Sequence, residues 1–271
     1  MLFARGIKVI SGVTVALAVS LTVAHAAKCG NTSRGFETWK QQFAAEARAN
    51  GIGKRGLAAL AKTRYSTSTI KADRGQKSFK YSLQKFMQVR GAATIVKQGR
   101  SQKRRHAKLL ANLEARYGVP PGVLMAIWGM ETAFGRYQGN TNLISATATL
   151  AYDCRRSEFF TGHLYAALQL VDRGVLSSST VGAKHGEWGQ TQFLPGSVAK
   201  YGRDGDGNGR LDLSRSTADA LASTANFLRA HGWKKGRGYQ PGQRNFRAIQ
   251  GWNAATVYQK AIAIMAAQID G

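Results

Sequence analysis

The sequence predicts a mainly α-helical fold, on two observations. Apolar residues recur at three- and four-residue spacing in most segments, as in Phe36, Trp39, Phe43 and Ala47. No strand-rich region and no internal repeat interrupts these segments. The hydrophobic fraction of 44% is enough for a packed interior, and 271 residues can hold one large domain, or a core with a smaller appendage.

Residues 1–26 are typical of a secretory signal peptide. Arg5 and Lys8 precede an apolar run, and Ala24-His25-Ala26 forms a small-residue cleavage site. The run is short for a membrane span, and no later segment replaces it. We therefore expect a soluble, periplasmic protein made of residues 27–271.

The chain is strongly basic, with a formal charge of +25. Loss of Arg5 and Lys8 with the signal would leave +23. Such a charge attracts polyanions over long distances but does not specify a fold. For a cytosolic chain the first partner to consider would be nucleic acid. Because an export signal is present, we expect an anionic polymer of the cell envelope instead.

The only two cysteines are Cys29 and Cys154. In an oxidising compartment a single pair favours a disulfide over a metal or catalytic role. The alternative is two free thiols. A disulfide would tie the start of the mature chain to its middle.

Turn residues and periodicity place the helices in order along the chain. Tyr65–Thr69 is polar and β-branched and predicts an extended loop, and a glycine-rich irregular stretch is expected at 232–245. Helices are expected at 35–50, 55–62, within 78–98, and at 101–117, 121–134, 143–152, 157–173, 195–201, 216–231 and 254–269.

The helix that begins at Pro120-Pro121 carries the main catalytic candidate, Glu131. Proline suits the first turn of a helix, and Gly135 is a natural stop. On this helix Glu131 shares a face with apolar residues three, four and seven positions earlier. Burial and the negative end of the helix dipole should both raise its pKa, which suits a general acid acting on a glycosidic oxygen. The alternative is a helix-end glutamate that turns towards water.

An acidic loop after residue 203 has the spacing of an EF-hand loop. Oxygen-bearing side chains occupy its first, third, fifth and ninth positions, and glycine its sixth. The twelfth position is Arg215, so the usual bidentate glutamate is missing, and Asp219 could supply a late carboxylate or a helix cap. Since acidic groups gathered in a basic chain repel one another, we expect a structural Ca²⁺ site rather than a metal-free turn. The candidate metal residues are Asp204, Asp206, Asn208, Arg210, Asp212 and Asp219.

The remaining acids limit the chemistry. A two-carboxylate glycosidase needs a partner across the cleft, which only Glu187 or Glu158 could supply. The sequence shows no Ser-His-Asp, zinc-ligand or phosphate-loop pattern.

Seven segments resemble the B-type lytic murein transglycosylases, which have a catalytic core like that of goose-type lysozyme. The resemblance implies a lysozyme-like helical core at about 101–271, an N-terminal helical part at about 34–100, and a small Ca-binding loop subdomain. The segments stand in family order from about residue 34 to the C-terminus: YGVPP, AIWGMETAFG, ATLAYDCRRSEFF, GEWGQTQFLP, DGDGNGRLDL, ANFLRAHGW and WNAATVY.

The activity implied by this resemblance is cleavage of the β-1,4 bond between N-acetylmuramic acid and N-acetylglucosamine in peptidoglycan, by a monomer and without water. Glu131 matches the single catalytic acid of the family. It would protonate the leaving oxygen and then deprotonate the muramoyl 6-hydroxyl, which leaves a 1,6-anhydromuramoyl end.

Other residues match positions that line the family's site. Two departures are that Ala183 replaces a serine and that Glu187 adds an acid near the cleft, where it could orient the substrate or a water. The matching residues are Arg155 and Arg156, suited to substrate carboxylates, Gln192, near the acetamido sugar, and the set Trp252, Asn253 and Tyr258.

Two rival functions are kept. The first is a muramidase of the same fold, with water positioned by Glu187. The second is a cationic wall-binding protein without catalysis. Nucleic-acid binding would require residues 1–26 not to act as an export signal.

Overall fold

The computed structural model describes residues 27–75 and 80–271, so the predicted export signal lies outside the described residues. Helices dominate the fold, as predicted. They are η1 (Ser33–Gly35), α1 (Phe36–Ala49), α2 (Lys54–Ala61), α3 (Thr67–Arg74), α4 (Leu83–Val89), α5 (Ala92–Arg105), α6 (Ala107–Tyr117), α7 (Pro121–Thr132), α8 (Leu143–Tyr152), α9 (Ser157–Asp172), α10 (Pro195–Tyr201), α11 (Thr217–Ala230), α12 (Phe246–Trp252) and α13 (Thr256–Asp270).

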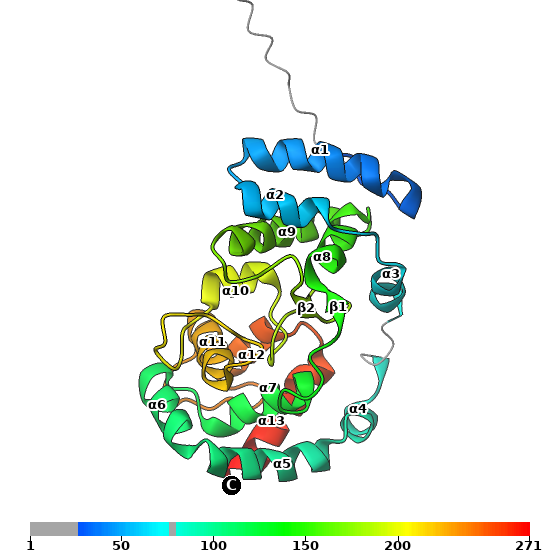
Figure 1. The fold of residues 1–271 in the computed structure, drawn as a ribbon. Coiled ribbons are helices and arrows are strands. Elements are labelled where there is room, and N and C mark those ends of the chain that lie inside the picture. Colours follow the sequence, from blue (N-terminus) through cyan, green and yellow to red (C-terminus); the bar gives the residue numbers. More distant parts are fainter. Residues whose placement is uncertain (1–26, 76–79) are drawn as a thin grey trace, which may run out of the picture.

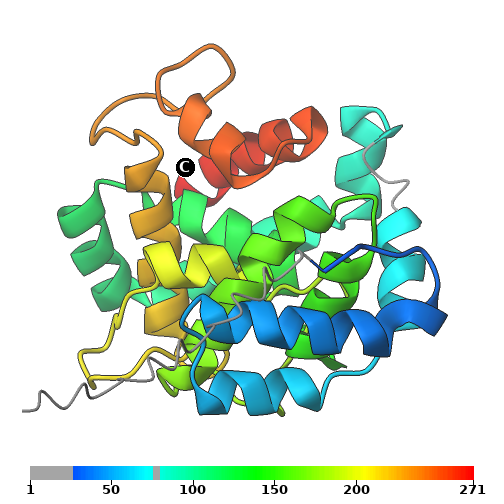
Figure 2. The same cartoon turned by 90° about the horizontal axis from the view of Figure 1, so that it is seen from above.

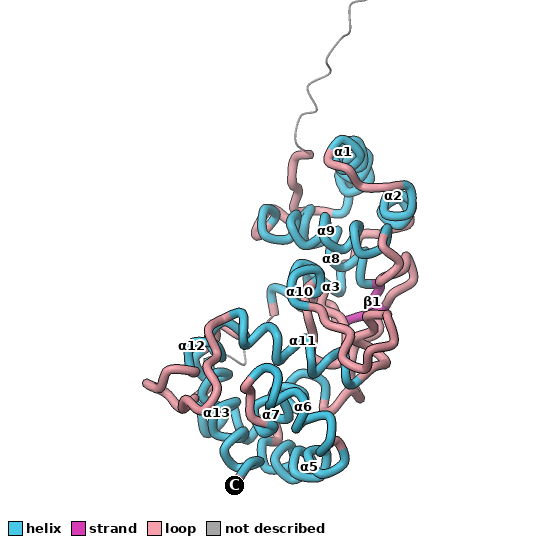
Figure 3. Tube along the Cα trace, turned by 90° about the vertical axis from the view of Figure 1, so that its left-hand side faces the viewer, coloured by secondary structure: helices cyan, strands magenta, loops and turns pink. Residues whose placement is uncertain are grey.

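The N-terminal helices α1 and α2 pack on α8 and α9 at one end of the molecule (Figures 1 and 3). Aromatic rings on the inner face of α1 fill this interface. Trp39 stacks on Phe43 with ring centroids 5.2 Å apart, and Phe36 meets Tyr152 of α8 edge-on at 5.5 Å. The periodic apolar face that predicts α1 is therefore the face that joins the two layers.

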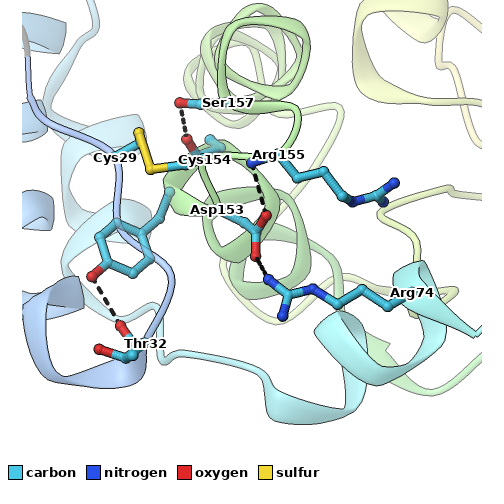
Figure 4. Close-up of a disulfide and its surroundings, with 9 residues drawn as sticks. Cys29, Thr32, Arg74, Asp153, Cys154, Arg155 and Ser157 are labelled. Carbon is cyan, nitrogen blue, oxygen red and sulfur yellow. Dashed lines mark hydrogen bonds and ion pairs between the residues drawn. A yellow bond between two sulfur atoms is a disulfide. The ribbon is translucent and has the colours of Figure 1, made fainter.

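A disulfide fixes the segment before α1 to the end of α8 (Figure 4). Cys29 and Cys154 are bonded, with their Cα atoms 5.0 Å apart. The Gly30 N–H donates to the Tyr152 carbonyl at 2.9 Å. A side chain at Gly30 would collide with the Tyr152 hydroxyl, which itself donates to the Thr32 carbonyl at 2.9 Å. The expected pairing of the cysteines is therefore present, and glycine at position 30 is required beside it.

At the opposite end, α7 is enclosed by α5, α6, α11 and α13. In Figure 2 it lies among these helices rather than on the outside. Ten of its 12 residues are buried, and apolar residues surround its axis on all sides. A helix enclosed in this way gives the residues at its end a rigid support.

One short antiparallel pair completes the fold: β1 (Thr141–Asn142) and β2 (Val181–Gly182). It joins the start of α8 to the loop after α9. Within residues 27–75 and 80–271, none of the helices has both the length and the apolar character needed to cross a membrane.

The structure corrects two sequence-based assignments. The predicted helix 101–117 is interrupted at His106, where α5 ends and α6 begins. The predicted loop Tyr65–Thr69 is in part helical, because the Ser66 hydroxyl accepts the Thr69 N–H at 3.2 Å and starts α3. The structure also has a helix, α12, between the predicted irregular stretch 232–245 and the predicted last helix, where the sequence led to no assignment.

Candidate active site

Glu131 lies in the last turn of α7, where the backbone changes direction sharply. The helix ends at Ala133, before the glycine that was predicted to stop it. Ala133 and Phe134 have left-handed φ angles of 49° and 61°, followed by Gly135 at 84°. The Thr132 hydroxyl donates to the Gln190 carbonyl at 2.5 Å and accepts the Gly135 N–H at 2.8 Å. These contacts hold a strained turn directly after the acid.

Two hydrogen-bond donors from the C-terminal helices meet on one oxygen of Glu131. The Trp252 indole N–H donates to Oε1 at 2.9 Å, and the Tyr258 hydroxyl donates to the same atom at 2.5 Å. Trp252 ends α12 and packs edge-on against Phe193 and Phe227, while Tyr258 is buried near the start of α13. Two parts of the chain, the end of α7 and the α12–α13 region 121 to 127 residues later, therefore define the position of the carboxyl group.

Burial raises the pKa of Glu131 above its usual range. The hydrogen bonds from Tyr258 and Trp252 and the charge of Arg90 act in the opposite direction, because each stabilises the ionised form. Burial and the charge of Glu131 raise the pKa of Tyr258 well above 10, so its hydroxyl stays a neutral donor. The raised pKa expected from the sequence is present, and its main cause is desolvation.

Glu187 is the second carboxyl group of the site. It lies in a tight loop in which its carbonyl accepts the Ala183 N–H at 2.8 Å. Burial and the neighbouring charge of Glu131 raise its pKa to about 8, and the charge of Arg156 opposes that rise. A group with this pKa is mostly protonated at neutral pH.

Arg155 and Arg156 lie in the loop between α8 and α9, and the charge of Arg156 acts on Glu187. Both guanidinium groups pair with the carboxylate of Asp73 on α3, which is only 3% exposed. The two arginine side chains remain 45% and 42% exposed. A guanidinium has five N–H donors, so each keeps donors for a ligand. The part of Asp73 was not predicted, because it and the arginines are about 80 residues apart.

Gln192 and Asn253 are placed by hydrogen bonds within their own turns. Gln192 has a left-handed φ of 56° and donates from Nε2 to the Gly189 carbonyl at 2.8 Å. Asn253 accepts the Ala255 N–H at 2.9 Å through Oδ1, and its carbonyl accepts from Gln259 at 2.8 Å. Asn253 therefore fixes the joint between α12 and α13, and with it the two donors to Glu131.

The acidic loop brings three carboxylates together, from Asp204, Asp206 and Asp219, whose oxygens lie within 4.8 Å of one another. Two other predicted ligands, Asn208 and Asp212, are not part of this group of three carboxylates. The Asn208 side chain accepts the Arg210 N–H at 2.8 Å, and Asp212 accepts two backbone N–H groups after it at 3.0 Å each. Clustered carboxylate oxygens fit a hard divalent cation such as Ca²⁺.

The sequence matches the transglycosylase SLT domain over residues 35–243. The chain belongs to this family. A curated relative, membrane-bound lytic murein transglycosylase B of Escherichia coli K12, is 39% identical over 122 residues, which are 44% of this chain and 34% of the relative. The chain thus spans about a third of the length of that relative.

Solved structures of related proteins share the fold. SltB3 of Pseudomonas aeruginosa, in complex with NAG-anhNAM-pentapeptide, has a TM-score of 0.81 and 30% identity, over 88% of this chain and 80% of SltB3. Slt35 of Escherichia coli, in complex with calcium, has a TM-score of 0.73 at 22% identity, over 90% of this chain and 96% of Slt35.

In this member of the transglycosylase SLT domain family, the residues singled out from the sequence lie in one group around Glu131 and another around Glu187 and the two arginines. Glu131, Trp252 and Tyr258 are in direct contact, and Asn253 supports them. The charge of Glu131 acts on Glu187 and helps to raise its pKa, and Arg155 and Arg156 are held by Asp73. Sequence analysis missed the carbonyl of Gln190, which anchors the end of α7; its only signal was the neighbouring Gln-Thr-Gln motif.

Proposed function

We propose that this protein is a periplasmic lytic transglycosylase that cleaves the β-1,4 bond between N-acetylmuramic acid and N-acetylglucosamine in peptidoglycan and forms 1,6-anhydromuramoyl ends. The observation that carries this proposal is a desolvated glutamate at the end of α7, Glu131, whose Oε1 receives two hydrogen bonds. Family membership over residues 35–243 supports it.

Glu131 would act first as an acid and then as a base. Its raised pKa keeps the carboxyl group protonated to higher pH than an exposed glutamate, so it can protonate the leaving glycosidic oxygen. The carboxylate that results is stabilised by the donors from Trp252 and Tyr258. It can then remove the proton of the muramoyl 6-hydroxyl as that oxygen attacks C1. One residue serves both steps, because the second step returns the proton lost in the first.

The electrostatics at Glu187 favour this lyase over a muramidase. A hydrolase of this fold would need an anionic base to activate water. With a pKa of about 8, Glu187 is mostly neutral at the pH where Glu131 works as an acid. Its protonated carboxyl group suits hydrogen bonding to a sugar better than proton abstraction.

The substrate class is supported by the relatives. SltB3 has been solved with NAG-anhNAM-pentapeptide and with NAG-NAM-pentapeptide. By analogy, the half-exposed Arg155 and Arg156 would bind carboxylates of a peptide stem, with Asp73 holding them in place. Gln192 would contact the acetamido group.

We also propose that the acidic loop binds Ca²⁺ as a structural ion. Asp204, Asp206 and Asp219 would supply carboxylate oxygens, and the structure of Slt35 with calcium supports the choice of ion. The ion would offset the mutual repulsion of these carboxylates and fix the loop that is hydrogen-bonded to the end of α7 through Gln138 and Ser214.

The decisive experiment combines the variant Glu131→Gln with mass spectrometry of digested sacculi. The wild type should release muropeptides with anhydro ends, which are lighter by one water than hydrolysed ends. The rate of Glu131→Gln should be about 10²–10⁴-fold lower than that of the wild type, as expected for removal of a general acid–base. Its circular dichroism spectrum and melting temperature should be unchanged. An active glutamine variant, or hydrated ends from the wild type, would overturn the assignment.

A further inference from the structure

A cavity of about 760 Å³ lies where the loop after α9 faces the acidic loop and the start of α2. Its volume is in the range of pockets that hold small ligands. Neither Glu131 nor the two residues that hydrogen-bond to it line this cavity. Its lining therefore does not include the proposed proton donor or the groups that hold it.

Four arginines line the cavity: Arg55, Arg173, Arg210 and Arg215. They come from the first turn of α2, the end of α9 and the acidic loop. The guanidinium nitrogens of Arg55 lie 3.6 and 3.8 Å from the position that a methyl group on Gly174 would occupy, so this side chain reaches from α2 to the loop after α9. Like charges brought together from separate segments repel one another, and a bound anion would relieve that repulsion.

None of the four guanidinium groups is neutralised by an acid in the described ranges. The ion pairs there involve other cations, namely Lys40, Arg74, Lys103, Arg155 and Arg156.

Two acids beside these arginines already accept backbone hydrogen bonds. Asp172 accepts the N–H groups of Gly53 and Gly56 at 2.7 and 2.8 Å. Asp212, which lines the cavity, accepts the N–H groups of Ser214 and Arg215 through Oδ1. The cavity therefore has a net positive lining whose donors face solvent.

Neutral donors complete the lining. Ser177 and Thr180 contribute hydroxyl groups from the loop after α9. The Ser177 N–H donates to the Thr180 hydroxyl oxygen at 2.8 Å, and the hydroxyl oxygens of Ser177 and Thr180 lie 3.2 Å apart and share a hydrogen bond, so the two hydroxyl groups are held together at the cavity wall. Hydroxyl groups beside planar guanidinium groups are suited to carboxylate and phosphate oxygens.

We propose that this cavity binds a small polyanion through at least two carboxylate or phosphate groups. The cavity is larger than one such group needs, and four guanidinium groups can hold more than one of them in bidentate geometry. The ligand could be a carboxylate-bearing peptide or a phosphate ester, and the test distinguishes these sources. The proposal does not depend on the reaction at Glu131.

The test follows backbone amide signals of the whole ¹⁵N-labelled protein by NMR, in metal-free buffer of constant ionic strength. Sodium citrate and sodium pyrophosphate are titrated separately as the carboxylate and phosphate probes. The signals of Gly174 and Gly209, which line the cavity, should shift and saturate. Saturation with citrate alone identifies a carboxylate ligand, with pyrophosphate alone a phosphate ligand, and either result supports the site.

The variant Arg173→Ala/Arg215→Ala should weaken binding by at least about 10-fold, because it removes two charge-assisted contacts. The matched control Arg104→Ala/Arg105→Ala removes the same charge from the exposed end of α5 and should bind like the wild type. If the double variant has a lowered melting temperature, the single variant Arg210→Ala is used in its place. Equal weakening in the control, no saturation with either probe, or shifts near Trp252 but not at Gly174 would overturn the proposal.

Discussion

The hydrogen bond from Tyr258 to Glu131 should set the alkaline limit of activity. The hydroxyl donates at 2.5 Å to Oε1 and stabilises the ionised carboxylate, which lowers the pKa of Glu131. The variant Tyr258→Phe removes this donor and little else, because the ring is buried. A hydrogen bond to a charged group contributes about 1.5–3 kcal/mol, which corresponds to a rise of about 1–2 pKa units.

Because Glu131 must be protonated to start the reaction, kcat/KM falls as the pH rises through its pKa. In Tyr258→Phe this alkaline limb should therefore move to higher pH by about 1–2 units. The assay is the rate of muropeptide release from purified sacculi across a pH series.

A matched control is Tyr165→Phe, which removes a hydroxyl that donates to Glu46 at 2.8 Å, a residue outside the catalytic site. Its pH profile should equal that of the wild type. The reasoning is refuted if the limb of Tyr258→Phe stays in place or moves to lower pH.

Three further predictions concern Glu187, the acidic loop and the disulfide. Glu187→Gln should reduce kcat/KM near neutral pH by less than about 10-fold and keep anhydro products, whereas loss of a general base would cost about 10²–10⁴. Hydrated products or a loss of that size would instead support the muramidase. Calcium at a 100-fold excess over Kd should stabilise the fold by about 2.7 kcal/mol, which is measured as a rise in melting temperature. Asp206→Asn should remove most of this rise, and the control Glu37→Gln should keep it. An equal rise in Asp206→Asn would show that Asp206 is not a ligand. Replacing Cys29 and Cys154 by serine should lower the free energy of unfolding by up to about 4–5 kcal/mol in urea titrations, and unchanged stability would contradict the loop-closure argument.

The sequence predicts those features that depend on neighbours along the chain. The apolar period of α1 and the prolines at the start of α7 fix these helices to within about two residues. The end of α7 could not be predicted, because it depends on a hydrogen bond from Thr132 to Gln190, 58 residues away. Local preference favours a stop at Gly135, and a tertiary contact moves it to Ala133.

The same distinction applies to the site. The position of Glu131 among apolar residues of one helix predicts a desolvated acid, and the structure has one. The donors to it, Trp252 and Tyr258, lie 121 and 127 residues away, so spacing alone could not pair them with Glu131. The family resemblance placed them in the site without showing how they meet Glu131; in the structure both donate to its Oε1.

The turn after Glu131 also bears on how this scaffold can vary. The backbone that follows the acid is clamped to the Gln190 carbonyl, and α7 itself is enclosed by other helices. Loops at the rim can therefore be lengthened or exchanged without displacing the proton donor. Sequence changes among descendants of this chain should accumulate in the surrounding loops and spare α7 and the contacts that hold its end.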